Sequence, residues 1–105
     1  MKKTVIVDRR GAKEIKKFPS IVQNKFRAVF AILESSGRIE EPVGKKLEGN
    51  NNLFEIRIKF RGQWRALYAY IAGDAIIILS AFIKKTQRTP PAEIEKAKKR
   101  LNEYK

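Results

Sequence analysis

Residues 53–83 constrain the fold of this chain more than any other stretch, because they read as three consecutive β-strands. From residue 54 to residue 61, apolar and polar side chains alternate, and this period of two is typical of a strand with one buried face. A turn at residues 62–63 separates this run from a second one, residues 64–71. Another turn leads to residues 75–83, which are almost wholly apolar, as expected for a central strand covered on both faces.

The polar face of the first strand is rich in cations. It carries Arg57, Lys59 and Arg61 against a single acid, Glu55. Further cations are expected at the ends of the neighbouring strands: Arg65, Lys84 and Lys85. Crowded cations cost free energy unless an anion joins them, so this face predicts a binding surface for a phosphate backbone. Three simpler interpretations stay open: a solvated face of ion pairs, an Arg65–Glu55 pair across the hairpin, and a strand end that lysines protect from aggregation.

The charge of the whole chain favours the same interpretation. With 24 Lys and Arg against 11 Asp and Glu, the formal net charge is +13. The charge is not concentrated in a tail, since residues 1–52 carry 12 of the cations and residues 53–105 carry the other 12. An evenly spread positive charge favours a polyanionic partner, either nucleic acid or an acidic protein. A lysine-rich, solubilised surface is the alternative, although such surfaces usually carry matching numbers of glutamates.

Several chemistries are excluded by residue types that the chain lacks. It contains no cysteine, which removes disulfides, thiolate metal sites and a cysteine nucleophile. It contains no histidine, the usual acid–base group at neutral pH. No Gly-rich phosphate loop and no HExxH motif is present, so we expect neither metal nor cofactor. No apolar run reaches the roughly 20 residues of a membrane-spanning helix, and no apolar signal segment follows Met1, so we expect a cytoplasmic protein without membrane contact.

The N-terminal half predicts a strand followed by two helices. A β-branched run at residues 4–7 is expected to form an edge strand. Residues 11–17 predict one or two helical turns with Asp8 as a possible cap. Apolar residues then recur at helical spacing over residues 20–36, and Gly37 follows at the usual C-terminal position. Residues 38–52 read as a loop because Pro, Gly and Asn break every period there.

The C-terminus predicts a last helix, with Thr89 as its N-cap and Pro90 at its first position. Its apolar stripe is expected to pack on the sheet. The 105 residues are enough for a single domain, residues 1–105, with one core. The predicted fold class is therefore α+β, in the order β-α-α-β-β-β-α, with a helical hairpin packed on a twisted, mostly antiparallel sheet.

Four short motifs occur in an order and at a spacing that resemble a known family. They are LFEIRI at residues 53–58, WRALY at residues 64–68, FIKKTQ at residues 82–87 and the Thr89–Pro90 pair. Together they resemble the RelE/ParE toxin superfamily, and within it the HigB-like, phage Gp49-like branch. The resemblance covers nearly the whole chain, including the helical hairpin.

The resemblance implies a small microbial RNase fold and the toxin of a type II toxin–antitoxin system. Such toxins enter the ribosomal A site and cut the bound mRNA without a metal ion. The cut is made by the 2′-hydroxyl of the RNA, which attacks the adjacent phosphate. The implied partners are mRNA, the ribosomal A site and a cognate antitoxin, in this branch usually a helix-turn-helix protein of the HigA type.

The resemblance also implies roles for individual residues. Arg57 matches a basic residue at the reacting nucleotide, Arg65 matches an arginine expected to clamp the phosphate, and Lys85 matches a basic residue that stabilises the transition state or the leaving oxygen. Contacts to the RNA backbone are expected from the remaining basic and polar residues of this surface: Lys45, Lys46, Lys59, Arg61, Lys84, Gln87 and Arg88.

The sequence departs from the RelE pattern at the general base. Where RelE has two lysines flanking one residue, this chain has Glu55 and Arg57, and an arginine cannot act as a base at neutral pH. Nor is there a tyrosine between residues 87 and 91. The candidates for the base are Glu55, Tyr68, Tyr70 and Lys85. Two other functions stay open: a ParE-type inhibitor of DNA gyrase that is not an enzyme, and an RNA-binding module without activity.

Overall fold

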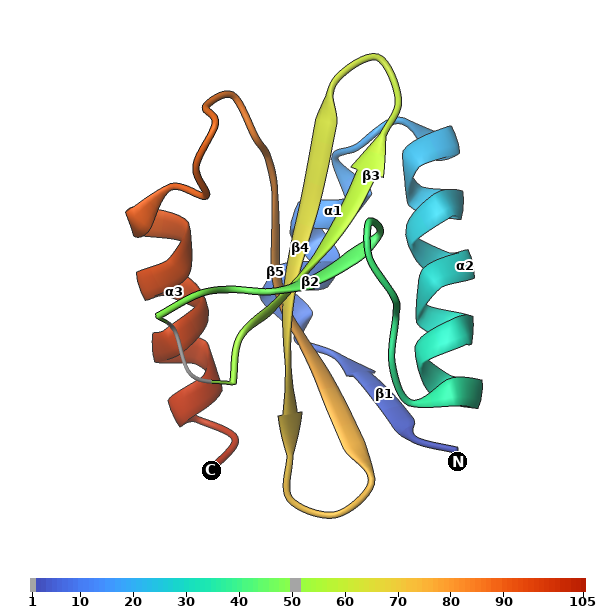
Figure 1. The fold of residues 1–105 in the computed structure, drawn as a ribbon, viewed down its shortest axis with the longest axis vertical. Helices are drawn as coiled ribbons and strands as arrows, with labels where there is room; N and C mark the ends of the chain where they lie inside the picture. Colours follow the sequence, from blue (N-terminus) through green and yellow to red (C-terminus); the bar gives the residue numbers. More distant parts are fainter. Residues whose placement is uncertain (1, 50–51) are drawn as a thin grey trace.

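A five-stranded mixed sheet lies between helices in the computed structural model, which describes residues 2–49 and 52–105 (Figure 1). The elements follow one another along the chain as β1 (Thr4–Val7), α1 (Arg9–Lys16), α2 (Ser20–Ser36), β2 (Gly44–Lys46), β3 (Phe54–Lys59), β4 (Gln63–Ile71), β5 (Ala75–Ile83) and α3 (Pro91–Asn102). The strand order across the sheet is β1-β5-β4-β3-β2. Only the β1–β5 pair is parallel, and the other three are antiparallel. The predicted fold class is confirmed.

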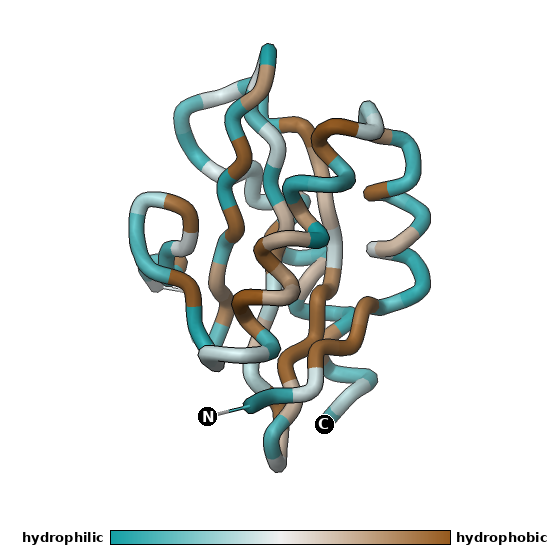
Figure 2. The backbone as a smooth tube through the Cα atoms, turned by 90° about the vertical axis from the view of Figure 1, so that its right-hand side faces the viewer, coloured by the Kyte–Doolittle hydropathy of each residue, from teal (hydrophilic) through white to brown (hydrophobic). Residues whose placement is uncertain are grey.

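The two faces of the sheet bury two separate sets of apolar side chains. On one face, residues of α1 and α2 such as Ile15 and Phe26 pack against Ile56 and Tyr68 of the sheet. On the other face, Ala97 and Leu101 of α3 pack against Leu67, Ile77 and Leu79. In Figure 1, α2 and α3 accordingly lie on opposite sides of the sheet. Figure 2 shows α2 towards the viewer, with hydrophobic and hydrophilic segments alternating along it, as expected for a helix with one buried face.

The start of the short helix α1 and the end of the long helix α2 form as their residues predict. Asp8 is the N-cap of α1, and its carboxylate accepts a hydrogen bond from the backbone N–H of Arg10. Gly37 ends α2 in the left-handed conformation, with φ of 83°, which glycine adopts without steric cost. These local signals therefore fix where the helical hairpin begins and ends.

The segment expected to be a loop contains a strand that the sequence did not reveal. Strand β2 pairs antiparallel with β3 through Gly44–Ile56, Lys45–Glu55 and Lys46–Phe54. Its three residues are too few to show a period, so its backbone pairing rather than its side chains defines it. A Cβ atom on Gly44 would lie 2.6 Å from the carbonyl oxygen of Ile39, so this close approach of two backbones requires glycine. Residues 50 and 51 of the same predicted loop lie outside the described residues.

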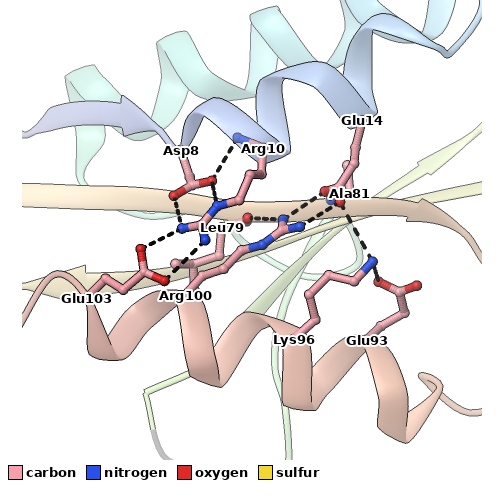
Figure 3. Close-up of polar contacts among 9 residues, drawn as sticks. All are labelled: Asp8, Arg10, Glu14, Leu79, Ala81, Glu93, Lys96, Arg100 and Glu103. Atoms are coloured by element: carbon pink, nitrogen blue, oxygen red, sulfur yellow. Dashed lines mark hydrogen bonds and ion pairs between the residues drawn. The ribbon is translucent and has the colours of Figure 1, made fainter.

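An ion pair completes the sheet where β1 ends too early. Strand β1 stops at Val7, whereas β5 continues to Ile83. Beyond that point Arg100 donates to the carbonyl oxygen of Leu79 at 2.8 Å, and Glu14 accepts from the N–H of Ala81 at 3.0 Å (Figure 3). A residue of a parallel strand opposite Ser80 would make these same two bonds. The Arg100–Glu14 pair, joined at 2.9 Å, therefore takes the place of one strand residue.

A second polar cluster ties the C-terminus to the start of α1. Arg10 bonds both Asp8 at 2.8 Å and Glu103 at 2.9 Å (Figure 3). Tyr104 donates its hydroxyl hydrogen to the same Asp8 carboxylate at 2.6 Å. The hydrogen bonds from Arg10, opposed by burial, hold the pKa of Asp8 well below its usual value. In Glu14 the effect of burial, which raises the pKa, is likewise outweighed by the bonds from Arg100 and Ala81. Both acids therefore remain ionised as anchors of α3.

No helix in the described part of the chain is long and apolar enough to cross a membrane.

We predict that Arg100→Ala lowers the free energy of unfolding by about 3 kcal/mol, because it leaves Glu14 and the Leu79 carbonyl oxygen without their partner. Unfolding in urea, followed by circular dichroism, measures the change. Lys98→Ala is the matched control on the same helix, since the Lys98–Glu95 pair is exposed and its nitrogen–oxygen distance is 3.6 Å. Its loss should cost less than about 0.5 kcal/mol. Equal effects of the two variants would contradict the structural role of the Arg100–Glu14 pair.

Candidate nucleic-acid interface

Strand register brings the predicted cations together on the face of the sheet that α3 covers in part. Arg57 of β3 stands directly opposite Arg65 of β4, and Arg65 stands opposite Phe82 of β5. Residues paired across neighbouring strands point to the same face. Lys84 follows Phe82 by two residues and contributes to the same surface, where it lines two hollows together with Arg57. Three strands thus deliver three cations to one place.

Glu55 is the acid in contact with Arg57 and Arg65, and it is 1% exposed, while Glu48 also lines one of the two hollows. One of its oxygens accepts a hydrogen bond from Nε of Arg57 at 3.1 Å and lies 3.7 Å from Nε of Arg65. The other oxygen accepts from the hydroxyl of Thr89 at 2.7 Å. A single carboxylate therefore serves two guanidinium groups, and the cluster keeps a surplus of positive charge.

Arg57 is held so that part of its guanidinium remains available. Its Nε is bound to Glu55, and its side chain stays 29% exposed. Within residues 2–49 and 52–105, its two terminal nitrogens have no hydrogen-bond partner. These two nitrogens are the donors that a guanidinium offers to a phosphate in a bidentate contact. Arg57 is thus an oriented, accessible cation.

Arg65 differs from expectation, because it is buried beneath the surface and only 3% exposed. Its terminal nitrogens donate to the carbonyl oxygen of Trp64 at 3.0 Å and to the side-chain oxygen of Gln63. Its Nε has no hydrogen-bond partner among the described residues. Burial lowers the pKa of Arg65, and Glu55 acts in the opposite direction. With its terminal nitrogens engaged, Arg65 is not free to clamp a phosphate in two places, and it contributes a charge below the surface instead.

Lys84, and not Lys85, lines the hollows that contain Arg57. Two hollows flank it: the first contains Lys45, Lys46 and Glu55, and the second contains Lys59 and Arg65. Lys85 is exposed and lines only a third, neighbouring hollow beside Lys84. Burial lowers the pKa of Lys84, and the charges of Arg65, Arg57 and Lys45 lower it further, while Glu55 opposes them. The surroundings of Lys84 therefore make its protonated form less favourable than in a free lysine.

The remaining predicted contacts fall into two groups. The first hollow brings together the cations of β2 and the polar residues that precede α3: Lys45, Lys46, Gln87 and Arg88. Arg61 lies apart from the three hollows, in the β3–β4 turn, where its guanidinium is 5.4 Å from the centre of the Phe60 ring. The structure thus groups these residues around Arg57 and Lys84, with Arg61 excepted.

Neither candidate tyrosine lies with the cations. Tyr68 is buried in the core on the opposite face, and burial raises its pKa. Tyr70 donates its hydroxyl hydrogen to the carbonyl oxygen of Gly37 at 2.7 Å, and burial raises its pKa as well. Glu55 has both oxygens engaged and almost no exposed surface. Of the four candidates for a base, only Lys85 is open to a ligand, and Lys84 now joins it.

The family profile of the phage-derived protein Gp49-like family matches residues 13–102. The chain belongs to this family. Among curated proteins, no sequence matches the chain significantly. The fold is shared with the E. coli toxin RelE in the free state, solved as a mutant with two arginines replaced by alanine. That structure has a TM-score of 0.73 and 24% identity, and the match covers 96% of this chain and 99% of that chain.

Two further solved structures support the same fold. The archaeal RelE–RelB complex from Pyrococcus horikoshii OT3 has a TM-score of 0.61 and 26% identity, over 79% of this chain and 96% of that chain. The RelBE2 toxin–antitoxin complex from Mycobacterium tuberculosis has a TM-score of 0.61 and 21% identity, over 80% and 100%. The Gp49-like chain is therefore a member of the RelE toxin superfamily, and the resemblance seen in its motifs is confirmed.

Two residues of this Gp49-like site were not recognised by sequence reasoning. Thr89 was expected to cap the last helix, but α3 begins after Pro90 with no side-chain cap, and the Thr89 hydroxyl binds Glu55 instead. Lys84 was expected only to hold the RNA backbone. A signal for it does exist, since Lys84 keeps the period of two that places Phe82 on the face of Arg65.

We predict that Lys84→Met raises the free energy of unfolding by about 0.5–1 kcal/mol, because it removes one of the crowded cations and keeps the apolar stem. For a domain of this size, 1 kcal/mol corresponds to roughly 4–8 °C in melting temperature. Thermal unfolding at low salt measures the shift. Lys85→Met is the control and should change the melting temperature little, since Lys85 is exposed. A lower melting temperature for Lys84→Met would show that the cations are not in conflict.

Proposed function

We propose that this chain is the toxin of a type II toxin–antitoxin pair and an endoribonuclease that cuts mRNA in the ribosomal A site without a metal ion. The observation that carries the proposal is the surplus of positive charge around Glu55. Arg57 and Lys84 face open hollows, and Arg65 lies buried beside them. A surface of this kind stabilises the negative charge that develops on a phosphate during phosphoryl transfer.

The proposed partners follow from the relatives that share the fold. The solved complexes of E. coli, M. tuberculosis and P. horikoshii each contain a RelE-type toxin with its antitoxin. These complexes support a cognate antitoxin for the present chain, for which we propose a helix-turn-helix protein of the HigA type. The proposed site of action, the ribosome, places the protein in the cytoplasm.

In the proposed reaction, the 2′-hydroxyl oxygen of a ribose attacks the adjacent phosphorus atom. Its proton passes to neutral Lys84, the O2′–P bond forms, and the P–O5′ bond breaks. The leaving 5′-oxygen takes a proton from solvent, so that the products are a 2′,3′-cyclic phosphate and a 5′-hydroxyl. Arg57 donates hydrogen bonds from its two terminal nitrogens to the equatorial phosphate oxygens. The buried charge of Arg65 stabilises the same phosphate without touching it.

Glu55 and Thr89 have a positioning role in this proposal. Glu55 fixes the direction of the Arg57 guanidinium through the 3.1 Å bond to its Nε. Thr89 in turn holds the second oxygen of Glu55, which joins the segment before α3 to strand β3. Because the carboxylate is buried and fully engaged, it takes no proton from the RNA.

We predict that Arg57→Ala reduces cleavage of a reporter mRNA on the ribosome by about 100-fold or more, which is the usual cost of removing a donor to a developing oxyanion. Lys85→Ala is the matched control and should stay within about threefold of the wild type, since Lys85 lies outside the hollows that contain Arg57. Primer extension measures the cut. Wild-type cleavage by Arg57→Ala would refute the site. Gyrase inhibition without cleavage by the wild type would favour a ParE-type function, and RNA binding without cleavage would favour an inactive module.

The role of Lys84 as base gives a separate prediction. Because its pKa lies below the ordinary lysine value of 10.5, its neutral fraction grows as pH rises and is complete at a lower pH than for a free lysine. The cleavage rate should therefore rise with pH and reach half of its maximum below pH 10.5. Lys84→Arg keeps the positive charge but cannot accept a proton, so RNA affinity should persist while the rate falls by about 100-fold. An unchanged rate or an unchanged pH profile in Lys84→Arg would exclude Lys84 as the base.

A further inference from the structure

One wall of the second hollow is apolar, although the hollow lies among cations. Pro42 and Val43 form this wall, and Arg57, Lys59 and Lys84 line the same hollow. Val43 is 37% exposed and is one of few large apolar side chains that reach the surface. An exposed apolar patch beside a charged site commonly indicates a ligand that has both an apolar part and a charged part.

The backbone holds the apolar wall at a fixed distance from Arg57, the cation proposed to bind the phosphate. The N–H of Arg57 donates to the carbonyl oxygen of Val43 at 2.7 Å. The next residue, Gly44, pairs with Ile56 in the β2–β3 ladder. The residue that presents the guanidinium therefore also anchors the residue that presents the apolar surface, and the two cannot move independently.

The polar wall of the same hollow offers a hydrogen-bond donor. Gln63 lines it, and the side-chain oxygen of Gln63 accepts from Arg65. Its amide NH2 group has no partner within the described ranges, 2–49 and 52–105. The hollow thus offers an apolar surface, a hydrogen-bond donor and a cation that can bind a phosphate. These three match the three parts of a nucleotide: the face of the base, the acceptors on its edge and the phosphate.

We propose that Pro42 and Val43 form a subsite for one unstacked base of single-stranded RNA, whose neighbouring phosphate is bound by Arg57 and Lys84. This inference rests on the RNA binding proposed above, but not on cleavage. The base lies with its face on Val43 and with an acceptor edge towards Gln63. The subsite makes the segment before β2 a determinant of which nucleotide stands beside the cut.

The test uses 2′-O-methyl RNA hexanucleotides, which lack the attacking hydroxyl and so cannot be cut. One oligonucleotide is intact, and each of the others has a single abasic residue, moved along the chain. Fluorescence anisotropy gives the dissociation constant for the wild type, for Val43→Thr and for Ile32→Thr. Val43→Thr keeps the shape of the side chain and makes it polar. Ile32→Thr is the matched control, because Ile32 is also exposed but lies on α2, against the opposite face of the sheet.

At one position, the abasic residue should weaken wild-type binding by about three- to tenfold, less than for stacking on an aromatic ring. Val43→Thr should weaken binding of the intact RNA by a similar factor and show no further loss with that abasic residue, whereas Ile32→Thr behaves as the wild type. If RNA binds tightly but no position shows this loss of sensitivity, the base subsite is wrong and the RNA proposal stands. If the wild type binds none of the oligonucleotides, both fail.

Discussion

The candidate site depends on the sharing of one buried carboxylate between two arginines. Without Glu55, the guanidinium groups of Arg57 and Arg65 would lie together with no counter-charge, which a folded protein avoids at considerable cost. If each arginine had a carboxylate of its own, both would be neutralised and no charge would remain for a ligand. One acid is enough to keep the cations in place and too little to neutralise them. The hydroxyl of Thr89 on the second oxygen keeps this balance, because it satisfies the carboxylate without adding charge.

The architecture leaves room for this site by covering one face of the sheet only in part. Helix α3 packs its apolar stripe on Leu67, Ile77 and Leu79, so the face beyond it, around Arg57 and Lys84, lies open. The helix is held in place by the Arg100–Glu14 pair, which also closes the free edge of β5. One ion pair therefore completes the β5 edge beyond the short first strand and also fixes the helix that covers part of this face.

Much of the fold could be predicted because the responsible patterns are local. Alternation along β3, the apolar run of β5 and the glycine after α2 each act within a few residues. The grouping of Arg57 with Arg65 also followed, since strand register is regular. Three features could not be predicted, because each depends on contacts distant in sequence: the pairing that makes β2 a strand, the burial of Arg65, and the choice between Lys84 and Lys85. The last requires knowing where β5 ends, and element ends are poorly marked in sequence.

The net charge of the chain does not locate the site. The site is located by which cations have an acid of their own and which share one. On α3 the cations have acidic neighbours, since Lys96 lies 3.3 Å from Glu93 and Arg100 lies 2.9 Å from Glu14. These ion pairs stabilise the fold, and because their charges neutralise each other they contribute little positive electrostatic potential for a ligand. Around Glu55 the cations outnumber the acid, and burial, with a smaller effect of the neighbouring cations, lowers the pKa values of Lys84 and Arg65. Crowding of this kind disfavours the folded state, and function is the usual reason that a fold tolerates it. A lysine paired with its own acid and a lysine that shares one acid with several cations are thus different observations, although composition counts them alike.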